Sequence, residues 1–172
     1  TTAVNESSST FSPILNRGAK DIREGFGLLN IPAALESILF ELSIDTEISD
    51  SVVSILGNST GVHSFARKIQ LTQNEYYNFT LSFSPSADLD FYIYKNTSNS
   101  YGDPIIIQQS STSEIQNESI VFGLRQDTGT YIVVIKAVSG IVTDFILNVT
   151  HLSNVHVPTL TNHEVGGIQG FN

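Results

Sequence analysis

Hydrophobic and polar residues alternate along most of the chain beyond residue 50, in short runs separated by turn residues. Alternation with a period of two is typical of strands that bury one face, so each run predicts a β-strand. One run, 131–137, is almost continuously apolar and β-branched, which predicts a central strand. The predicted strands are 51–56, 65–71, 74–83, 88–94, 104–108, 119–124, 131–137 and 145–152.

The number and spacing of these runs indicate a fold class. Many short strands with turns between them are typical of an antiparallel β-sandwich or jelly roll. The alternation argues against a doubly wound parallel sheet, whose strands are apolar throughout. We therefore expect a mainly β protein with one N-terminal helix.

That helix is predicted from a different periodicity ahead of the strands. Asn30 is a favourable N-cap, and Pro32 lies in the first turn, where its missing N–H costs nothing. Apolar residues then recur at helical spacing, which predicts a helix over 31–42. The apolar stripe has no helical partner nearby in the sequence, so it must dock on another surface; it consists of Ala33, Ala34, Leu35, Ile38, Leu39 and Leu42.

These patterns divide the chain into five segments. Residues 1–12 are polar and aperiodic, which predicts a flexible N-terminal segment. A glycine-containing turn and the helix occupy 13–42, and acidic residues over 43–50 predict a linker. The β-sandwich is expected over 51–153, followed by an extended tail over 154–172.

The turn before the helix carries a family resemblance. The residues Gly25-Phe26-Gly27-Leu28-Leu29-Asn30, followed by Ala34-Leu35, resemble the closing segment of the subtilisin-like (S8) serine protease catalytic domain. In that family a similar turn leads into the last helix of the domain. The resemblance implies that 13–42 belongs to such a domain, and that its remainder is a partner of this chain.

The strands carry a second resemblance, to the pre-peptidase C-terminal (PPC) β-sandwich. Its motifs, in order along the chain, are 66–71, 76–81, 87–94, 129–134 and 145–149. Such domains follow the catalytic domain in secreted archaeal and bacterial subtilases. Together the two resemblances imply the C-terminal part of a secreted subtilisin-like protease.

Catalysis by this chain itself is not expected. Acyl transfer of the subtilisin type needs an Asp, a His and a nucleophilic Ser in a Gly-Thr-Ser-like loop. The sequence has no such serine motif, and its histidines at 63, 151, 156 and 163 do not have the spacing of a compact metal site. We therefore predict that the chain is not an enzyme, although the parent protein would be a serine endopeptidase.

Composition narrows the choice of partners and surroundings. The formal net charge of −9 argues against nucleic acid and anionic membranes as partners, because both would repel the chain. Cysteine is absent, and no apolar run approaches the ~18–20 residues of a membrane-spanning helix. Six Asn-x-Ser/Thr sequons, more than the composition predicts by chance, indicate an extracellular or cell-surface glycoprotein; their asparagines are Asn5, Asn58, Asn78, Asn96, Asn117 and Asn148.

Two aspartates are candidate metal ligands. Asp88 and Asp90 lie on one side of a predicted strand, where alternate carboxylates converge, and hard cations such as calcium prefer oxygen ligands. Related protease-appended sandwiches bind calcium, so the resemblance favours this ion. In the alternative interpretation, Asp88 bonds the turn at 84–86 and Asp90 pairs with Arg67 or Lys68. Tyrosines 76, 77, 92, 94 and 101 form either an exposed aromatic face or ordinary cross-strand packing.

Two functions follow from the sequence. In the first, the chain is a non-catalytic accessory region that stabilises a secreted subtilisin-like protease or binds its substrate or the cell surface. In the second, it is a glycosylated subunit of an extracellular filament that self-associates by strand exchange through 1–15 or 155–172.

Overall fold

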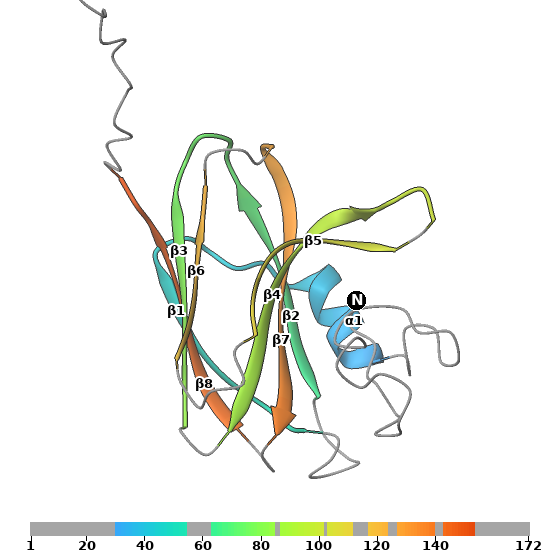
Figure 1. The fold of residues 1–172 in the computed structure, drawn as a ribbon, viewed down its shortest axis with the longest axis vertical. Helices are drawn as coiled ribbons and strands as arrows, with labels where there is room; N and C mark the ends of the chain where they lie inside the picture. Colours follow the sequence, from blue (N-terminus) through green and yellow to red (C-terminus); the bar gives the residue numbers. More distant parts are fainter. Residues whose placement is uncertain are drawn as a thin grey trace, which may run out of the picture.

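The protein is a sandwich of two antiparallel four-stranded sheets with one helix against the second sheet (Figure 1). The computed structural model describes residues 30–54, 63–84, 87–101, 103–111, 117–123, 127–139 and 143–153. The mainly β fold with one N-terminal helix, predicted from the sequence, is confirmed for these residues. The predictions for 1–12, most of the 13–42 segment before Asn30, and the tail beyond 153 lie outside them.

The first sheet has the strand order β1-β8-β3-β6, and the second has the order β2-β7-β4-β5. Helix α1 precedes all the strands and lies on the side of the second sheet that faces away from the first (Figure 1). The elements are α1 (Ile31–Leu39), β1 (Thr46–Val52), β2 (Ser64–Leu71), β3 (Tyr77–Phe83), β4 (Asp88–Ser98), β5 (Pro104–Ser110), β6 (Glu118–Phe122), β7 (Gly129–Ser139) and β8 (Thr143–His151).

The first strand starts earlier than the sequence predicts. β1 begins at Thr46, inside the segment 43–50 that reads as a linker, and it pairs with β8 from Thr46↔Val149 to Val52↔Thr143. Its acidic residues Glu47 and Asp50 are exposed. An edge strand tolerates such charges, because one of its sides has no neighbouring strand. Charge alone therefore did not distinguish this strand from a linker.

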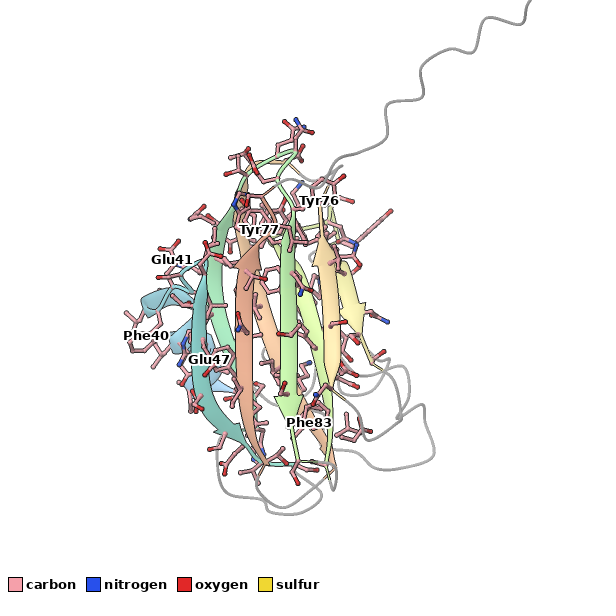
Figure 2. All side chains as sticks on the ribbon, turned by 90° about the vertical axis from the view of Figure 1, so that its left-hand side faces the viewer. Phe40, Glu41, Glu47, Tyr76, Tyr77 and Phe83 are labelled. Atoms are coloured by element: carbon pink, nitrogen blue, oxygen red, sulfur yellow. The ribbon has the colours of Figure 1, made fainter. Side chains whose placement is uncertain are left out.

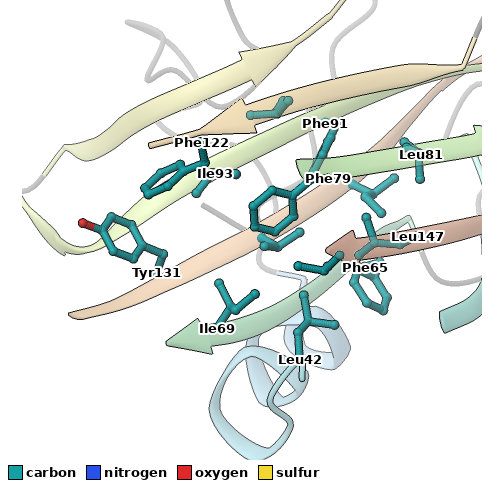
Figure 3. Close-up of a cluster of buried hydrophobic side chains, with 14 of the residues drawn as sticks. Leu42, Phe65, Ile69, Phe79, Leu81, Phe91, Ile93, Phe122, Tyr131 and Leu147 are labelled. Carbon is teal, nitrogen blue, oxygen red and sulfur yellow. The ribbon is translucent and has the colours of Figure 1, made fainter. Parts of the chain in front are cut away.

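Aromatic pairs join the two sheets across the core (Figure 3). The ring centroids of Phe79 on β3 and Phe91 on β4 lie 6.0 Å apart. Phe122 of β6 meets Tyr131 of β7 edge-on at 5.1 Å, and Phe65 of β2 meets Phe145 of β8 at 5.4 Å. Each pair takes one ring from each sheet, and such contacts add about 0.5–1.5 kcal/mol beyond the burial of their area.

The second sheet is covered on both faces. Leu89, Phe91 and Ile93 of β4 point into the core between the sheets, whereas Tyr92 and Tyr94 of the same strand are buried on the outer side. The outer cluster also contains Val134 of β7, Ala66 of β2 and Ala33 of α1. Burial of both faces explains why 131–137 is apolar except for Lys136, and the position of β7 between β2 and β4 confirms it as a central strand.

Helix α1 ends at Leu39, three residues before the predicted boundary. Phe40 is extended, and the chain then runs beside β2, where Leu42 N–H donates to the Lys68 carbonyl at 2.7 Å. Lys68 N–H donates in turn to the Phe40 carbonyl at 3.2 Å. Leu42 therefore belongs to the sandwich core, with 3% exposure, and not to the helical stripe. Its spacing fits both structures, which is why the sequence misplaced it.

Replacing a core phenylalanine tests this packing. We expect Phe79→Ala to lower the free energy of unfolding by about 3–5 kcal/mol, because the ring is fully buried and leaves a cavity. Urea denaturation measures the change. Phe40→Ala is the matched control, since that ring is 54% exposed and its loss should cost much less. Equal losses from the two variants would contradict the assignment of the core.

Candidate functional site

Helix α1 presents its large apolar side chains to solvent. Small or polar residues face the sheet: Ala33 is fully buried, and Glu36 and Ser37 are half-buried. A surface helix normally does the opposite and buries its large apolar side chains. The exposed side chains, at 51–68% exposure, form what we call the outer apolar patch: Ile31, Leu35, Ile38, Leu39 and Phe40.

The N-terminus of α1 is fixed to the sheet by Asn30. Its side-chain oxygen accepts a hydrogen bond from Ala33 N–H at 3.3 Å, which caps the helix as the sequence predicts. Its amide nitrogen donates to Ser64 Oγ, at the start of β2, at 2.9 Å. Both Asn30 and Ser64 are buried, so this contact holds the helix start in one position.

Two basic residues of β2 hold the rest of the helix. The Arg67 guanidinium contacts Glu36 Oε2 of α1 at 2.5 Å and Asp50 Oδ2 of β1 at 3.7 Å. The same guanidinium lies 4.4 Å from the centroid of the Phe65 ring and 5.0 Å from that of Phe40, at cation–π distance. Lys68 Nζ donates to the Ile38 carbonyl at 2.9 Å, where a helix end favours a cation.

These contacts decide which way the outer apolar patch points. The polar and small side of α1 is bonded to β2, so the large apolar side must face outward. Contiguous exposed apolar residues of this kind mark interaction sites in soluble proteins. The sequence analysis expected the helix to dock on another surface, but it placed Ala33 and Leu35 on one stripe, whereas they lie on opposite sides.

A buried polar cluster lies on the same side of the second sheet as α1. Asp90 of β4 is fully buried, and Tyr92 OH donates to its Oδ2 at 2.9 Å. Lys136 of β7 is paired with Asp90 in the strand register, and its Nζ lies 5.7 Å from the Tyr92 ring centroid. The Tyr94 ring lies 5.9 Å from that of Tyr92.

Burial changes the proton affinities in this cluster. It lowers the pKa of Lys136 to about 8, although the nearby Asp90 carboxylate acts in the opposite direction. It also raises the pKa of Tyr94 well above the usual value, and there Asp90 adds to the effect. An amine of lowered pKa next to a buried carboxylate makes this region sensitive to pH.

The basic residues expected as alternative partners of the predicted metal ligands are bonded elsewhere in the structure. Arg67 and Lys68, expected as alternative partners of Asp90, bond to Glu36 and to the Ile38 carbonyl instead. Two further aspartates, Asp103 and Asp127, are also bonded elsewhere: Asp103 accepts from Asn99, and Asp127 pairs with Lys95 at 3.4 Å. Among the described residues, no group of three or more His, Asp or Glu is placed to hold a metal ion. Calcium binding at Asp88 and Asp90 stays a prediction.

The sequons differ in their surroundings. Asn78 of β3 and Asn148 of β8 are half-buried, and Asn96 near the end of β4 is exposed. Asn117, just before β6, accepts a hydrogen bond from Phe83 N–H at 3.4 Å through its side-chain oxygen. Asn5 and Asn58 lie outside the described residues. Glycosylation at each of the six stays a prediction.

The tyrosines do not form one exposed face. Tyr77 points into the core, Tyr92 and Tyr94 are buried on the outer side of the second sheet, and Tyr101 at the β4–β5 turn is 85% exposed. His151 pairs with Glu75, with Nε2 and Oε2 2.6 Å apart. No helix in the described ranges is long and apolar enough to cross a membrane.

The lowered pKa of Lys136 predicts a pH-dependent stability. Between about pH 8 and 10 the unfolded chain keeps a proton on this amine that the folded chain has lost, so stability should rise with pH, by up to about 3 kcal/mol. Above pH 10 it should fall again, because the raised pKa values of Tyr94 and Tyr131 favour ionisation of the unfolded chain. Urea denaturation at stepped pH measures both limbs. In Lys136→Met the rise should vanish, and its persistence there would contradict this origin.

Comparisons with known proteins add no family assignment. No family model matches the chain, and no curated protein matches it. Among solved structures, it is similar to the pre-peptidase C-terminal domain of collagenase from Bacillus anthracis, at 8% identity and a TM-score of 0.48, over 64% of this chain and 92% of that one. It is also similar to the periplasmic g-type lysozyme inhibitor PliG of Aeromonas hydrophila, at 8% identity and a TM-score of 0.35, over 60% and 84% of the two chains. With both TM-scores below 0.5, the β-sandwich assignment rests on the chain's own two sheets.

Proposed function

We propose that this chain is a non-catalytic accessory region of a secreted subtilisin-like protease, in which a PPC-like β-sandwich attaches to the catalytic domain through α1. The observation that carries the proposal is the outer apolar patch. Burying one Leu, Ile or Phe side chain contributes about 1.5–3 kcal/mol, so a surface that covered the patch would be held firmly.

The occupant of the patch, in this proposal, is the rest of the subtilisin-like catalytic domain. The sequence leading into α1 at Asn30 resembles the end of that domain, so the covering body would lie upstream in the same polypeptide. Attachment within one chain raises the effective concentration of the two surfaces, and the patch alone would then suffice to hold them together.

The polar contacts of α1 give the sandwich its accessory role. Asn30, Glu36 and the Ile38 carbonyl bond to β2, so α1 is held on the sandwich. In this proposal its other side contacts the catalytic domain. The sandwich would then stabilise the last helix of the catalytic domain. Its remaining surface would be available for the substrate or the cell surface. An extracellular location is supported by the six sequons.

A second candidate function is self-assembly by strand exchange. It is favoured by the position of β1 at the edge of the first sheet, where β8 is its sheet neighbour on one side only. A terminal segment of another copy would add there. The segments 1–15 and 155–172, proposed as donors, lie outside the described residues.

Charge placed in the patch distinguishes docking from internal packing. In the isolated chain, the double variant Leu35→Glu/Ile38→Glu should change the free energy of unfolding by less than about 1 kcal/mol, because both side chains are exposed. In the parent protease, the same change should shorten the half-life at elevated temperature several-fold, because the docked surface is lost. Thermal inactivation assays measure this.

Val121→Glu is the control, since the exposure of Val121, 58%, lies between those of Leu35 and Ile38 and the residue belongs to the other sheet. It should leave the inactivation rate unchanged. An unchanged half-life in the double variant would refute docking through α1. A homopolymer of the chain that disappears when 1–15 is deleted would replace the accessory function with strand exchange.

A further inference from the structure

The outer face of the first sheet, opposite the helix, brings two sequons together. Figure 2 views this sheet face-on, with the strand order β1, β8, β3 and β6. One sequon, Asn78-Phe79-Thr80, lies on β3, and the other, Asn148-Val149-Thr150, lies on the adjacent β8. The two are 70 positions apart in sequence, and only the pairing of these strands makes them neighbours.

The register interlocks the two sequons. Asn78 is paired with Thr150, and Asn148 is paired with Thr80, so each asparagine lies opposite the hydroxyl residue of the other sequon. Phe79 and Val149, the middle residues, are buried in the core. Because successive side chains of a strand point to opposite faces, both asparagines and both threonines point outward. The two asparagines are diagonal neighbours, about 7–8 Å apart.

Neither asparagine amide is engaged by the described part of the chain. Besides the strand pairing, a side-chain hydrogen bond runs from Thr150 Oγ1 to the backbone carbonyl of Asn78 at 3.3 Å, and it involves neither amide. Asn117 differs, because its side-chain oxygen accepts the Phe83 N–H. An amide that serves no structural bond can carry a bulky substituent without loss of a contact.

Exposed apolar side chains flank the interlocked sequons. Val121 of β6 is paired with Asn78 and is 58% exposed. Ile146 of β8 lies two residues before Asn148, on the same face, and is 40% exposed. A substituent on Asn78 would cover Val121, and one on Asn148 would cover Ile146. The face therefore offers two attachment points, each beside an apolar side chain that a sugar ring can shield.

We propose that Asn78 and Asn148 are N-glycosylated as a pair, and that the two glycans cover the outer face of the first sheet. In each step, the amide nitrogen forms a bond to C1 of an oligosaccharide held on a lipid phosphate carrier. The C1–O bond to the phosphate breaks, the carrier leaves with the electron pair, and the amide proton passes to a base of the transferase.

The strand order leaves time for the modification of Asn78 before the sheet closes. β3 lies between β8 and β6, and both of these strands follow it in the chain. Asn78 is therefore unpaired until they have been made, whereas in the folded sheet it is fixed between two neighbours. This order of synthesis leaves the sequon accessible to the transferase before β8 closes the sheet.

Glycopeptide mass spectrometry of the full chain, secreted by the organism that makes it, tests the proposal. Both positions should carry a glycan. Asn78→Gln and Asn148→Gln should each lower the intact mass by one glycan, and the double variant by two. Thr80→Val removes the first sequon at almost constant shape and should also lose one glycan, whereas Thr80→Ser preserves the motif and should lose none.

An unmodified asparagine at either position in the secreted wild-type chain would overturn the pair. The shielding is tested separately by light scattering. The double Asn→Gln variant should self-associate more than the glycosylated chain, and adding Val121→Thr/Ile146→Thr should reverse this. Self-association unchanged by the loss of both glycans would overturn the covering role.

Discussion

Burial of the second sheet on both of its faces is the constraint on which the rest of this molecule depends. On one face, rings from β2, β4 and β7 meet rings of the first sheet. On the other, Tyr92, Tyr94 and Val134 need a cover, and α1 contributes the small side chain of Ala33 to it. A larger residue there would hold the helix away from the sheet, beyond reach of the polar contacts from β2.

The same constraint accounts for the unusual chemistry on that side. Asp90 and Lys136 would be ordinary solvated residues on an open sheet, but here they lose much of their water. The loss of water disfavours the charged form of the Lys136 amine, and its pKa is therefore lowered. The first sheet shows the contrast. Its outer face is mostly hydroxyl and amide side chains, with residues such as Asn78 and Thr80 only half-buried.

Much of the fold could be predicted from the sequence because the core imposes a period of two on the strands that bury one face. Phe79 and Leu81 on β3, or Phe145 and Leu147 on β8, alternate with polar residues for this reason. β1 was misplaced because its exposed acidic residues carry no such period, and Leu42 was misplaced because its spacing fits a helix equally well. Strand register decides which residues of neighbouring strands are paired, such as Asp90 with Lys136 or Asn78 with Thr150. The local hydrophobic pattern of one strand does not predict this register.

The short stretch after α1 has a mechanical consequence. Residues 40–42 run parallel to β2 and are hydrogen-bonded to Lys68 in both directions. A pull on the chain upstream of α1 would load the contacts of α1 with β2 first, and these two backbone bonds after them. Because β2 pairs with β7 and β7 pairs with β4, tension that reaches these bonds would be carried into the interior of the second sheet.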